Sequence, residues 1–526
     1  MCRYIATIIF TLTVAHATHA TRYHVRAGAT GNDTGFNWND ALVSLQSALS
    51  LSVAGDEIWV AAGQYKPTDS FDQMVSFQVP NGVNLYGGFA GGETDLSQRI
   101  VANNLTVLNG DIGQPGVDWD NSYTVIAYNN INTEITLDGF RIMNGNSANG
   151  FHGGGLRVTN SISGHVLVKN CHIVKNVAQT YGGGVYLAAA TLTLEDCILE
   201  DNDCGGGSGG AICNGNNNNG YSNLSVIGTR FIKNKGRLGA CIYNTVQYAD
   251  LLFDRCAFTD NTSLISLISV DGFDAARMLN SCIIGNTVDE GSGNILFVNS
   301  FGEQDVFSLT NCTIAHNFNL QADESQDVVV RFDDAHHVIT NCIIHGNTRF
   351  DGRQINSGPA ITYCLIEAGD TGGEGNVDGD PLFAAPFNAE PTDFDVTAFD
   401  YSLQSGSPAI DAGSDQAVIP EYSRDLADLP RIQGVVVDMG CYESDQSVAV
   451  ERSGPDQHAY FYDAQMDQMV FHAANAPSTS PIALFDATGK LVHSFTPRGS
   501  RYALTLDPGT YTAVSPELGV LRFIVH

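Results

Sequence analysis

The apolar residues of this 526-residue chain recur in short alternating runs between turn residues. From about 137 to 369 a nine-residue pattern repeats, usually with Cys at its centre and an apolar residue two positions later. Residues 309–317 (LTNCTIAHN) and 339–347 (ITNCIIHGN) are nearly identical copies. Alternation over so few residues predicts short strands. The centres of the nine copies are positions 140, 171, 197, 229, 256, 282, 312, 342 and 364.

A second strand pattern lies between these copies, at GGGLRV (153–158), GGGVYL (182–187), GGAICN (209–214) and GACIYN (239–244). Each period of about 28 residues therefore holds at least two short strands. One period cannot bury its own apolar face, so neighbouring periods must stack. Such a period is typical of a parallel β-helix. We predict an all-β fold, a parallel β-helix of about 9–12 coils.

In such a stack, equivalent positions form columns along the coils. We expect the central cysteines to be buried, reduced thiols that face inward, with Phe140 and Thr229 in their place in two coils. The asparagine five residues after the centre is expected at a turn, where its amide bonds the coils above and below. The expected cysteines are Cys171, Cys197, Cys256, Cys282, Cys312, Cys342 and Cys364, and the asparagines are Asn176, Asn202, Asn234, Asn261, Asn317 and Asn347.

Three further cysteines, Cys204, Cys213 and Cys241, lie outside this column but near each other in the order of the coils. In an exported protein they are candidates for one disulfide or a metal site. Spacing typical of zinc ligands is absent, and no histidine partner stands beside them, which disfavours zinc.

The two ends of the chain differ from the repeats. Residues 1–20 have a positive start, an apolar run and small residues, as in a secretory signal peptide. No run is long enough to span a membrane, so we expect a secreted, extracellular protein. A helix over about 39–52 is expected to cap the stack. The β-helix is expected over 21–444, a polar linker over 445–458, and a small β-sandwich over 459–526.

The charge balance of the chain limits the classes of partner that it is expected to bind. The chain has 57 acidic and 25 basic residues and a formal net charge of −32. Nucleic-acid binding depends on neutralising phosphates with Lys and Arg, so this composition argues against a nucleic-acid partner. It suits solubility outside a cell and loose association with Ca²⁺.

The expected cap, GDEIWVAAGQYKPT (55–68), GVNLYGGFAGGE (82–93), the GGG strands and SPAIDAG (407–413) resemble exported right-handed parallel β-helix repeat proteins. These proteins have the pectate-lyase-like superfold, and some are known as choice-of-anchor surface proteins. The resemblance covers about 23–443. It implies a right-handed coil, a surface role, and a closing segment (375–443) that packs as the last coil and its cap.

The last part of the chain resembles a second family. DATGKLV (486–492) and LDPGTYTAV (506–514) are similar to strands of the C-terminal sorting domain of type IX secretion. The frequent Asn-Pro of that family is absent, which leaves a generic accessory β-sandwich as the alternative. The resemblance implies secretion machinery as a partner, and anchoring at the outer-membrane surface.

The best candidates for catalysis lie in VVVRFDDAHH (328–337). β-Helix lyases and hydrolases need carboxylates beside a base or an acid on neighbouring coils. The alternative is a solvated loop at the end of a strand. The candidate catalytic residues are Arg331, Asp333, Asp334, His336 and His337, and neighbouring coils could add Asp271, Asp274, Arg277, Glu303, Asp305, Arg349, Asp351 and Arg353.

Asp378 and Asp380 are candidate Ca²⁺ ligands, because carboxylates are the ligands that Ca²⁺ prefers. The alternative for this Asp-Gly-Asp-Pro stretch is a turn closed by bonds from its own side chains to the backbone. The fold alone decides no activity.

The leading hypothesis is a glycan-binding, adhesin-like surface β-helix without catalysis, whose partner is a polysaccharide or cell-surface glycan. One alternative is a Ca²⁺-assisted polysaccharide lyase or a glycoside hydrolase that acts on acidic polysaccharide. The other alternative is a structural spacer for a protein partner.

Overall fold

The computed structural model describes residues 20–215, 221–289, 293–302, 304–320, 328–348, 354–356, 358–367, 372–387 and 399–444, and strands between His458 and Val525. The chain divides into two compact units, Met1–Glu443 and Ser444–His526. The expected signal peptide (1–20), except for its last residue, and nearly all of the expected linker (445–458) lie outside the described residues. Among the described residues no helix could span a membrane.

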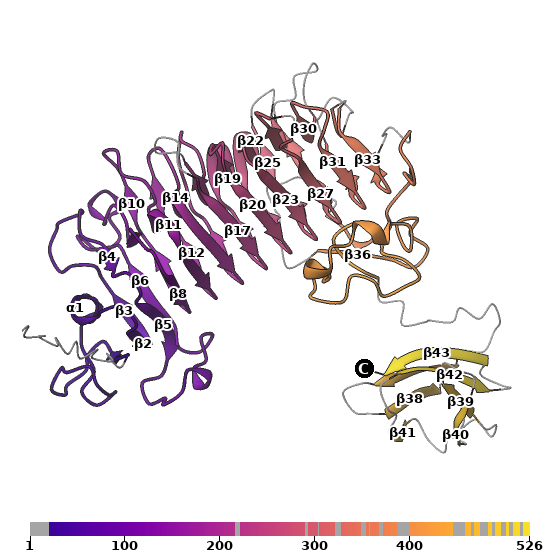
Figure 1. Ribbon diagram of the computed structural model, residues 1–526, viewed down its shortest axis with the longest axis horizontal. Coiled ribbons are helices and arrows are strands. Elements are labelled where there is room, and N and C mark those ends of the chain that lie inside the picture. The colour runs from indigo at the N-terminus through magenta and orange to yellow at the C-terminus, as the bar shows by residue number, and fades with distance from the viewer. Residues whose placement is uncertain are drawn as a thin grey trace, which may run out of the picture. The chain divides into compact units, whose positions relative to one another are not determined.

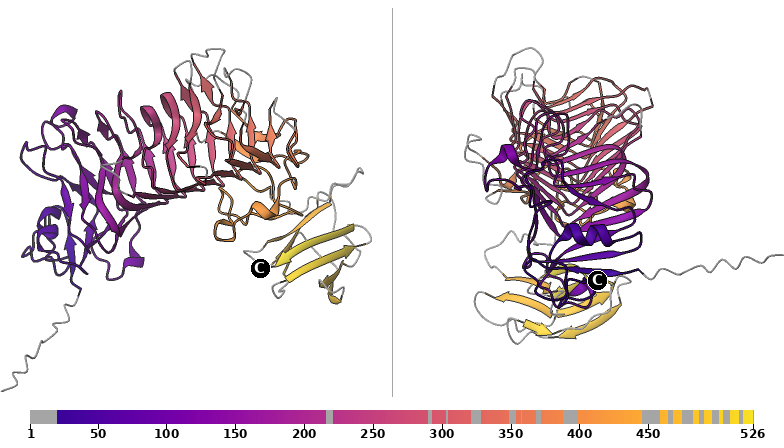
Figure 2. Two further views of the ribbon diagram at one scale, coloured as in Figure 1. Left: turned by 45° about the horizontal axis from the view of Figure 1, so that its top comes forward. Right: turned by 90° about the vertical axis from the view of Figure 1, so that its left-hand side faces the viewer.

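The first unit is a parallel β-helix, in which each strand pairs in parallel with its equivalent in the next coil (Figures 1 and 2). Three strand ladders run along it, here called faces 1, 2 and 3. Face 2 follows the central residue of each repeat, and the described residues form 11 short strands on it. They are β3 (Gly63–Tyr65), β6 (Thr106–Asn109), β9 (Phe140–Met143), β12 (His172–Val174), β15 (Ile198–Glu200), β18 (Arg230–Ile232), β21 (Ala257–Thr259), β24 (Cys282–Ile284), β28 (Thr313–Ala315), β32 (Ile343–His345) and β34 (Leu365–Ile366).

Face 1 precedes the central residue. It consists of β1 (Arg22–Val25), β2 (Glu57–Ala61), β5 (Asn84–Phe89), β8 (Glu134–Asp138), the ends of β11 (Leu156–Lys169) and β14 (Val185–Glu195), then β17 (Asn223–Ile227), β20 (Asp250–Asp254), β23 (Ala275–Leu279), β27 (Phe307–Thr310), β31 (Val338–Thr340) and β33 (Ala360–Thr362).

Face 3 follows the glycine-rich turns. It consists of β4 (Phe77–Val79), β7 (Ile126–Asn129), the starts of β11 and β14, β16 (Ile212–Asn214), and the ends of β19 (Lys235–Asn244) and β22 (Thr262–Asp271), then β26 (Asn294–Asn299) and β30 (Val330–Phe332). The turn between faces 2 and 3 contains β10 (Asn146–Ser147), β13 (Val177–Ala178), β25 (Thr287–Val288) and β29 (Phe318–Asn319).

The inward side chains of all three faces form one continuous apolar core. On face 2 the column contains Ile173, Leu199, Phe231 and Phe258, which are fully buried. The rings of Phe231 and Phe258 stack with centroids 4.5 Å apart. Because one coil alone leaves this column exposed, the hydrophobic stabilisation arises only when coils stack.

The predicted asparagine ladder is confirmed and has one more member. The Asn176 side-chain amide donates to Oδ1 of Asn202 over 3.1 Å, and the backbone N–H of Asn176 donates to the same oxygen over 3.2 Å. The pattern continues to Asn347 through Asn286, which the sequence alignment placed outside the column. Since Asn286 is in the ladder, the repeat at 279–287 is displaced by one residue from its predicted register.

The same displacement corrects the cysteine column. Ser281, not Cys282, occupies the central position of its coil, because its hydroxyl accepts from the backbone N–H of Cys256. Cys282 pairs with Ala257 of β21 and points to the other side of face 2. The cysteines of the described chain are buried and free, so the predicted reduced column is otherwise confirmed. Cys204, Cys213 and Cys241 also form no disulfide.

The helix near the N-terminus is shorter than predicted. α1 covers Leu45–Leu51, and Ser44 caps its first turn by accepting from the backbone N–H of Ser47. Its buried side chains Leu45, Ala48 and Leu49 pack toward β1, β2 and β4. That this helix caps the stack stays a prediction. Short 3-10 turns cover η1 (Leu96–Gln98), η2 (Asp118–Asp120), η4 (Asp415–Ala417) and η5 (Pro420–Tyr422).

The closing segment only partly forms a last coil. Val377 donates to the carbonyl of Cys364 and so continues face 2. The chain then forms the β35–β36 hairpin (Phe383–Ala385 and Asp400–Leu403) and folds back over the outer side of face 2. The backbone N–H of Cys441 donates to Oγ1 of Thr313, and the backbone N–H of Gly440 donates to the carbonyl of Asn341. Residues 424–443 therefore cover earlier coils from the side.

The second unit has two antiparallel sheets. One contains β37 (His458–Asp463), β38 (Gln468–Ala473) and β41 (Arg501–Ala503). The other contains β39 (Ile482–Asp486), β40 (Leu491–Phe495), β42 (Gly509–Ser515) and β43 (Gly519–Val525). The packing of the two sheets as a sandwich stays a prediction.

Candidate functional site

The predicted catalytic residues lie on β30 of face 3 and in the turn that follows this strand. Arg331 is on β30, and its guanidinium pairs with Asp333 over 3.1 Å. Its other neighbour is the Phe297 ring on the preceding coil, whose centroid is 5.7 Å away. Ion pairing and the cation–π contact together hold Arg331 flat against the outer side of face 3.

The next residues connect two coils through polar contacts. The Ser300 hydroxyl donates to Oδ2 of Asp334 over 3.0 Å and lies 3.2 Å from Nε2 of His336. That nitrogen is also 3.2 Å from the carbonyl oxygen of Asp305. A carbonyl only accepts, so Nε2 of His336 carries a proton in this contact. Asp333 and Asp334 are exposed and His336 is partly exposed.

His337 is separated from this surface. Its side chain is fully buried among Phe332, Phe307 and Phe273, and its Nδ1 accepts from the backbone N–H of Phe307 over 3.1 Å. Burial lowers its pKa to about 4, and the neighbouring His336 contributes. His337 therefore supports the loop from the core. The catalytic assignment of the other four residues stays a prediction.

Further polar residues follow the same edge of the β-helix, where face 3 turns into face 1. The Asn299 amide donates to Asp271 over 2.6 Å. Burial raises the pKa of Asp274, and the charges of Asp250 and Asp305 raise it further. Of the other predicted contributors, Arg277 lies on β23 of face 1, while Glu303, Arg349, Asp351 and Arg353 lie outside the described residues.

Three exposed aromatic side chains lie on this edge, and sequence reasoning missed them. Tyr221, Tyr248 and Phe301 have exposed fractions of 56%, 39% and 59%. The rings of Tyr221 and Tyr248 are 5.4 Å apart. Phe301 lies over Gly272, where an added Cβ would be 2.6 Å from the Phe301 ring and 3.0 Å from Cα of Gln247. We call these three residues the aromatic ridge.

Residues of the aromatic ridge lie directly beside the polar pairs in the sequence. Phe301 directly follows Ser300, and Gly272 directly follows Asp271. Aromatic faces offer apolar contact area with little loss of side-chain entropy, and carboxylates and amides accept or donate hydrogen bonds beside them. The edge can therefore bind an extended ligand that has both apolar faces and hydroxyl groups.

The candidate Ca²⁺ ligands close their own turn. Oδ1 of Asp378 accepts from the backbone N–H of Gly379 over 2.8 Å, and Oδ1 of Asp380 accepts from that of Leu382 over 2.9 Å. In the described part of the chain, no group of three or more His, Cys, Asp or Glu side chains has the arrangement of a metal site. The Ca²⁺ assignment stays a prediction.

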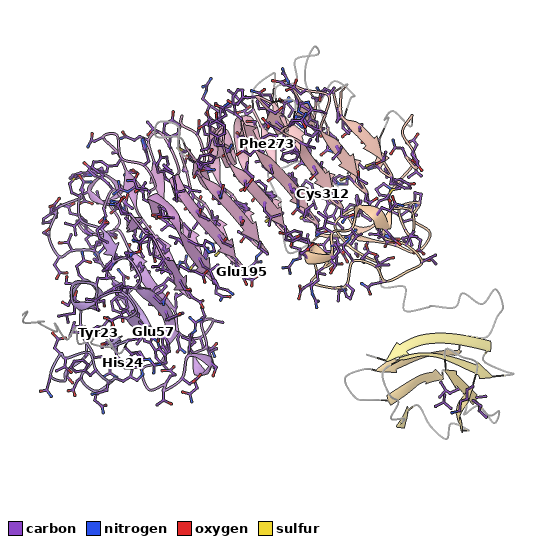
Figure 3. The ribbon with its side chains drawn as sticks, in the orientation of Figure 1. Tyr23, His24, Glu57, Glu195, Phe273 and Cys312 are labelled. Carbon is purple, nitrogen blue, oxygen red and sulfur yellow. The ribbon has the colours of Figure 1, made fainter. Side chains whose placement is uncertain are left out.

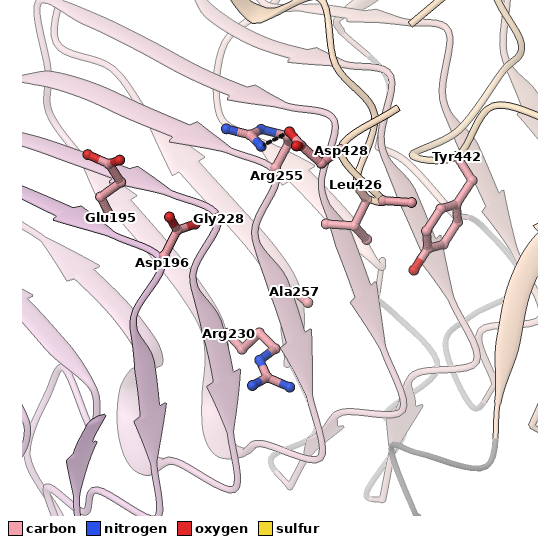
Figure 4. A pocket seen from close by; sticks show the side chains of 10 residues that line it. Glu195, Asp196, Gly228, Arg230, Arg255, Ala257, Leu426, Asp428 and Tyr442 are labelled. Carbon is pink, nitrogen blue, oxygen red and sulfur yellow. Dashed lines mark hydrogen bonds and ion pairs between the residues drawn. The ribbon is translucent and has the colours of Figure 1, made fainter. Parts of the chain in front are cut away.

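A separate groove lies between the coils and the closing segment (Figure 4). Its volume is ≈ 640 Å³. It lies on the outer side of face 2, and residues of the closing segment line one of its walls. The lining residues are Glu195, Asp196, Gly228, Arg230, Arg255, Ala257, Leu426, Ala427, Asp428 and Tyr442.

The groove contains several ion pairs. Arg255 pairs with Asp428 of the closing segment over 2.6 Å and with Asp254 over 3.2 Å. Glu195, labelled in Figure 3, pairs with Lys169 over 2.8 Å. Burial and the Glu195 charge raise the pKa of Asp196. The groove thus combines charges of both signs with an apolar wall from Leu426 and Ala427.

Comparisons with known proteins give similarity of structure only. No family model matches the chain, and no curated protein sequence matches it. Among solved structures, the pectate lyase Pel9A is similar with a TM-score of 0.39 and 13% identity, over 81% of this chain and 97% of that one. XylC in complex with xylose is similar with a TM-score of 0.36 and 9% identity, over 80% and 98%.

A tailspike protein of the E. coli bacteriophage HK620, in complex with a pentasaccharide, is similar with a TM-score of 0.23 and 12% identity. The match covers 68% of this chain and 70% of that one. The parallel β-helix of the present chain is established by its own strand registers.

Proposed function

We propose that this protein binds a polysaccharide along the aromatic ridge and has no catalytic activity of its own. The observation that carries the proposal is the line of exposed rings, Tyr221, Tyr248 and Phe301, beside the hydrogen-bonding groups of Asp271, Asn299 and Asp334. Soluble proteins rarely leave several large aromatic side chains exposed together unless the surface binds something.

The chemistry of the ridge favours sugar over other ligands. Sugar rings have apolar faces formed by C–H groups and edges formed by hydroxyls, so they need stacking surfaces and hydrogen-bonding groups side by side. The rings follow one another along the β-helix, with Tyr221 and Tyr248 on adjacent coils and Phe301 two coils beyond Tyr248, and neighbouring coils are about 4.8 Å apart. A repeating polymer is therefore a better match than a compact ligand.

The rest of the chain has a place in the same proposal. Residues 1–20 direct export, the right-handed coil displays the ridge, α1 caps the first coils, and the second unit serves as a sorting module that secretion machinery recognises. The protein then acts outside the cell or at the outer-membrane surface. Mass spectrometry of the mature N-terminus and C-terminus, after expression in a bacterium with type IX secretion, tests this part.

Binding is tested with the full chain and a panel of immobilised polysaccharides that includes neutral and acidic polymers. The variants are Tyr248→Ala and Phe301→Ala, and the matched control is Phe71→Ala, which removes another exposed ring (73% exposed) away from the ridge. Retention of the parent and the control, but not of the ridge variants, supports the proposal.

The same samples test the enzymatic alternative. Release of unsaturated or reducing ends, with or without Ca²⁺, is measured beside Asp333→Ala and Arg331→Ala. Release of such ends that depends on Asp333 or Arg331 would replace the binding proposal with a lyase or hydrolase. If no polysaccharide is retained or cleaved, a structural spacer for a protein partner becomes the better account.

A further inference from the structure

Most charged side chains of the groove on face 2 already have partners. Arg255 is held between Asp254 and Asp428, and Glu195 is held by Lys169. Two charges remain without an ion pair or a side-chain hydrogen bond among the described residues: the carboxylate of Asp196 and the guanidinium of Arg230. They are of opposite sign and lie on adjacent coils, since Ile198 of β15 pairs with Arg230 of β18.

The groove exists because one side-chain ladder is interrupted. The residue before the central position has a positive φ in each of these coils, for example 52° at Asp196 and 51° at Arg255. Farther along the chain, the residues at this position bond to each other, as Asn311 does to Asn280 over 3.0 Å. Between Asp196 and Arg255 the position is Gly228, which has no side chain.

The gap at Gly228 is long enough for a ligand. Asp196 and Arg255 are two coils apart, roughly 10 Å at the usual strand spacing. The Asp196 carboxylate lies over the glycine, since an added Cβ at Gly228 would be 2.4 Å from its Oδ1. The groove volume of ≈ 640 Å³ is in the range of small-molecule sites.

We propose that this groove binds a small zwitterion, a molecule with both an ammonium group and a carboxylate. Asp196 accepts hydrogen bonds from the ammonium group, and Arg230 binds the carboxylate through its paired N–H donors. Leu426, Ala257 and the Tyr442 ring contact the uncharged part of the ligand. The source is an amino acid or peptide, or a saccharide unit that carries both groups. This site is distinct from the aromatic ridge.

The test uses the full chain and probes of matched size in isothermal titration calorimetry. The peptide series is glycylleucine, N-acetylglycylleucine, which lacks the cation, and glycylleucine amide, which lacks the anion. The sugar series is a 2-amino-2-deoxyuronic acid, the corresponding uronic acid and the corresponding amino sugar. In at least one series the zwitterion binds, and both singly charged analogues bind at least tenfold more weakly. The series with the tighter zwitterion identifies the source.

Asp196→Asn and Arg230→Gln each remove one charge and nearly preserve the shape of the side chain. Gly228→Asn fills the groove and displaces the Asp196 carboxylate, whose Oδ1 would be 2.4 Å from the added Cβ, and Asn tolerates the positive φ of 58° there. Each of the three variants is expected to weaken zwitterion binding at least tenfold. The control variants Arg237→Gln and Glu134→Gln remove exposed charges elsewhere on the coil and leave binding unchanged.

Circular dichroism and thermal unfolding establish that each variant is folded, and Gly228→Asn tests the site even if one charge variant does not fold. The proposal is overturned if no zwitterion binds at millimolar concentration, or if a singly charged analogue binds as tightly as the zwitterion. Unchanged affinity in the folded Asp196→Asn, Arg230→Gln or Gly228→Asn protein also overturns it.

Discussion

The side-chain amide of Asn234 donates a hydrogen bond to Oδ1 of Asn261 over 2.9 Å, and the backbone N–H of Asn234 donates to the same oxygen over 2.8 Å. The amide also donates to the carbonyl of Leu199, one coil back, over 2.8 Å. One buried side chain thus connects three successive coils. Repeated from Asn176 to Asn347, this arrangement satisfies the backbone at a turn that water does not reach.

Asn234→Ala is expected to lower the free energy of unfolding by about 3 kcal/mol, because it leaves buried donors of Asn202 and the Leu199 carbonyl without partners. Chemical denaturation followed by circular dichroism measures the change. Asn103→Ala, at an exposed turn position, is the control, with an expected change under about 0.5 kcal/mol. Equal effects of the two substitutions would show that the ladder does not stabilise the stack.

The buried cysteines are expected to be unreactive in the folded protein. Burial raises the pKa of Cys171 and of Cys204 to about 12, so both are neutral thiols at pH 8, and the thiolate is the reactive form. An Ellman titration at pH 8 should label none of the described cysteines in the native chain and all of them in denaturant. Rapid labelling of the native chain would contradict the burial of the column.

The buried His337 predicts a loss of stability in weak acid. Its pKa in the folded protein is lowered to about 4, below the ordinary value of 6.5, so the unfolded chain binds a proton that the folded chain does not. The contribution of His337 to the free energy of unfolding is therefore fully present above pH 6.5, and it is lost as pH falls from 6.5 toward 4. Unfolding midpoints over this range should depend less on pH in His337→Asn, whose amide can still accept from Phe307.

His316 stays in both proteins, so its own lowered pKa cancels in this comparison. The same pH dependence in the variant and the parent would mean that His337 is already protonated, or solvated, in the folded chain.

The closing segment is expected to be held by packing rather than by its ion pair. Met439 is fully buried over face 2, so Met439→Ala should lower the free energy of unfolding by about 2–5 kcal/mol. Asp428 is 64% exposed, so Asp428→Asn should change the free energy of unfolding by less than about 1 kcal/mol, despite the contact with Arg255. Denaturation curves of both variants compare the two contributions. A larger effect of Asp428→Asn would reverse this account.

Local repetition made the coils predictable. The period, the inward column and the ladder asparagines all follow from residues that recur near one another in the chain. The error at 279–287 arose because Cys282 matches the pattern one residue late, while Ser281 performs the bonding of the column with a hydroxyl. At 279–287, aligning the cysteine gave the wrong register, whereas the five-residue spacing from Ser281 to Asn286 indicates the correct one.

Contacts between distant parts of the chain were not predictable in the same way. Arg255 meets Asp428, 173 residues later, and neither neighbourhood repeats in a way that indicates the contact. The aromatic ridge was missed because Tyr221, Tyr248 and Phe301 lie in turns of variable length, outside any period. His337 was grouped with His336 by adjacency, although successive residues of an extended chain point to opposite sides.

The most direct test of the central claim is the affinity of the full chain for the polysaccharide that it retains best. Calorimetry would compare the parent, the Tyr248→Ala/Phe301→Ala double variant and Phe71→Ala. We predict that the double variant binds at least about tenfold more weakly, a loss of about 1.4 kcal/mol or more, and that Phe71→Ala binds like the parent. If the double variant is folded and binds as tightly as the parent, the ridge is not the glycan-binding surface.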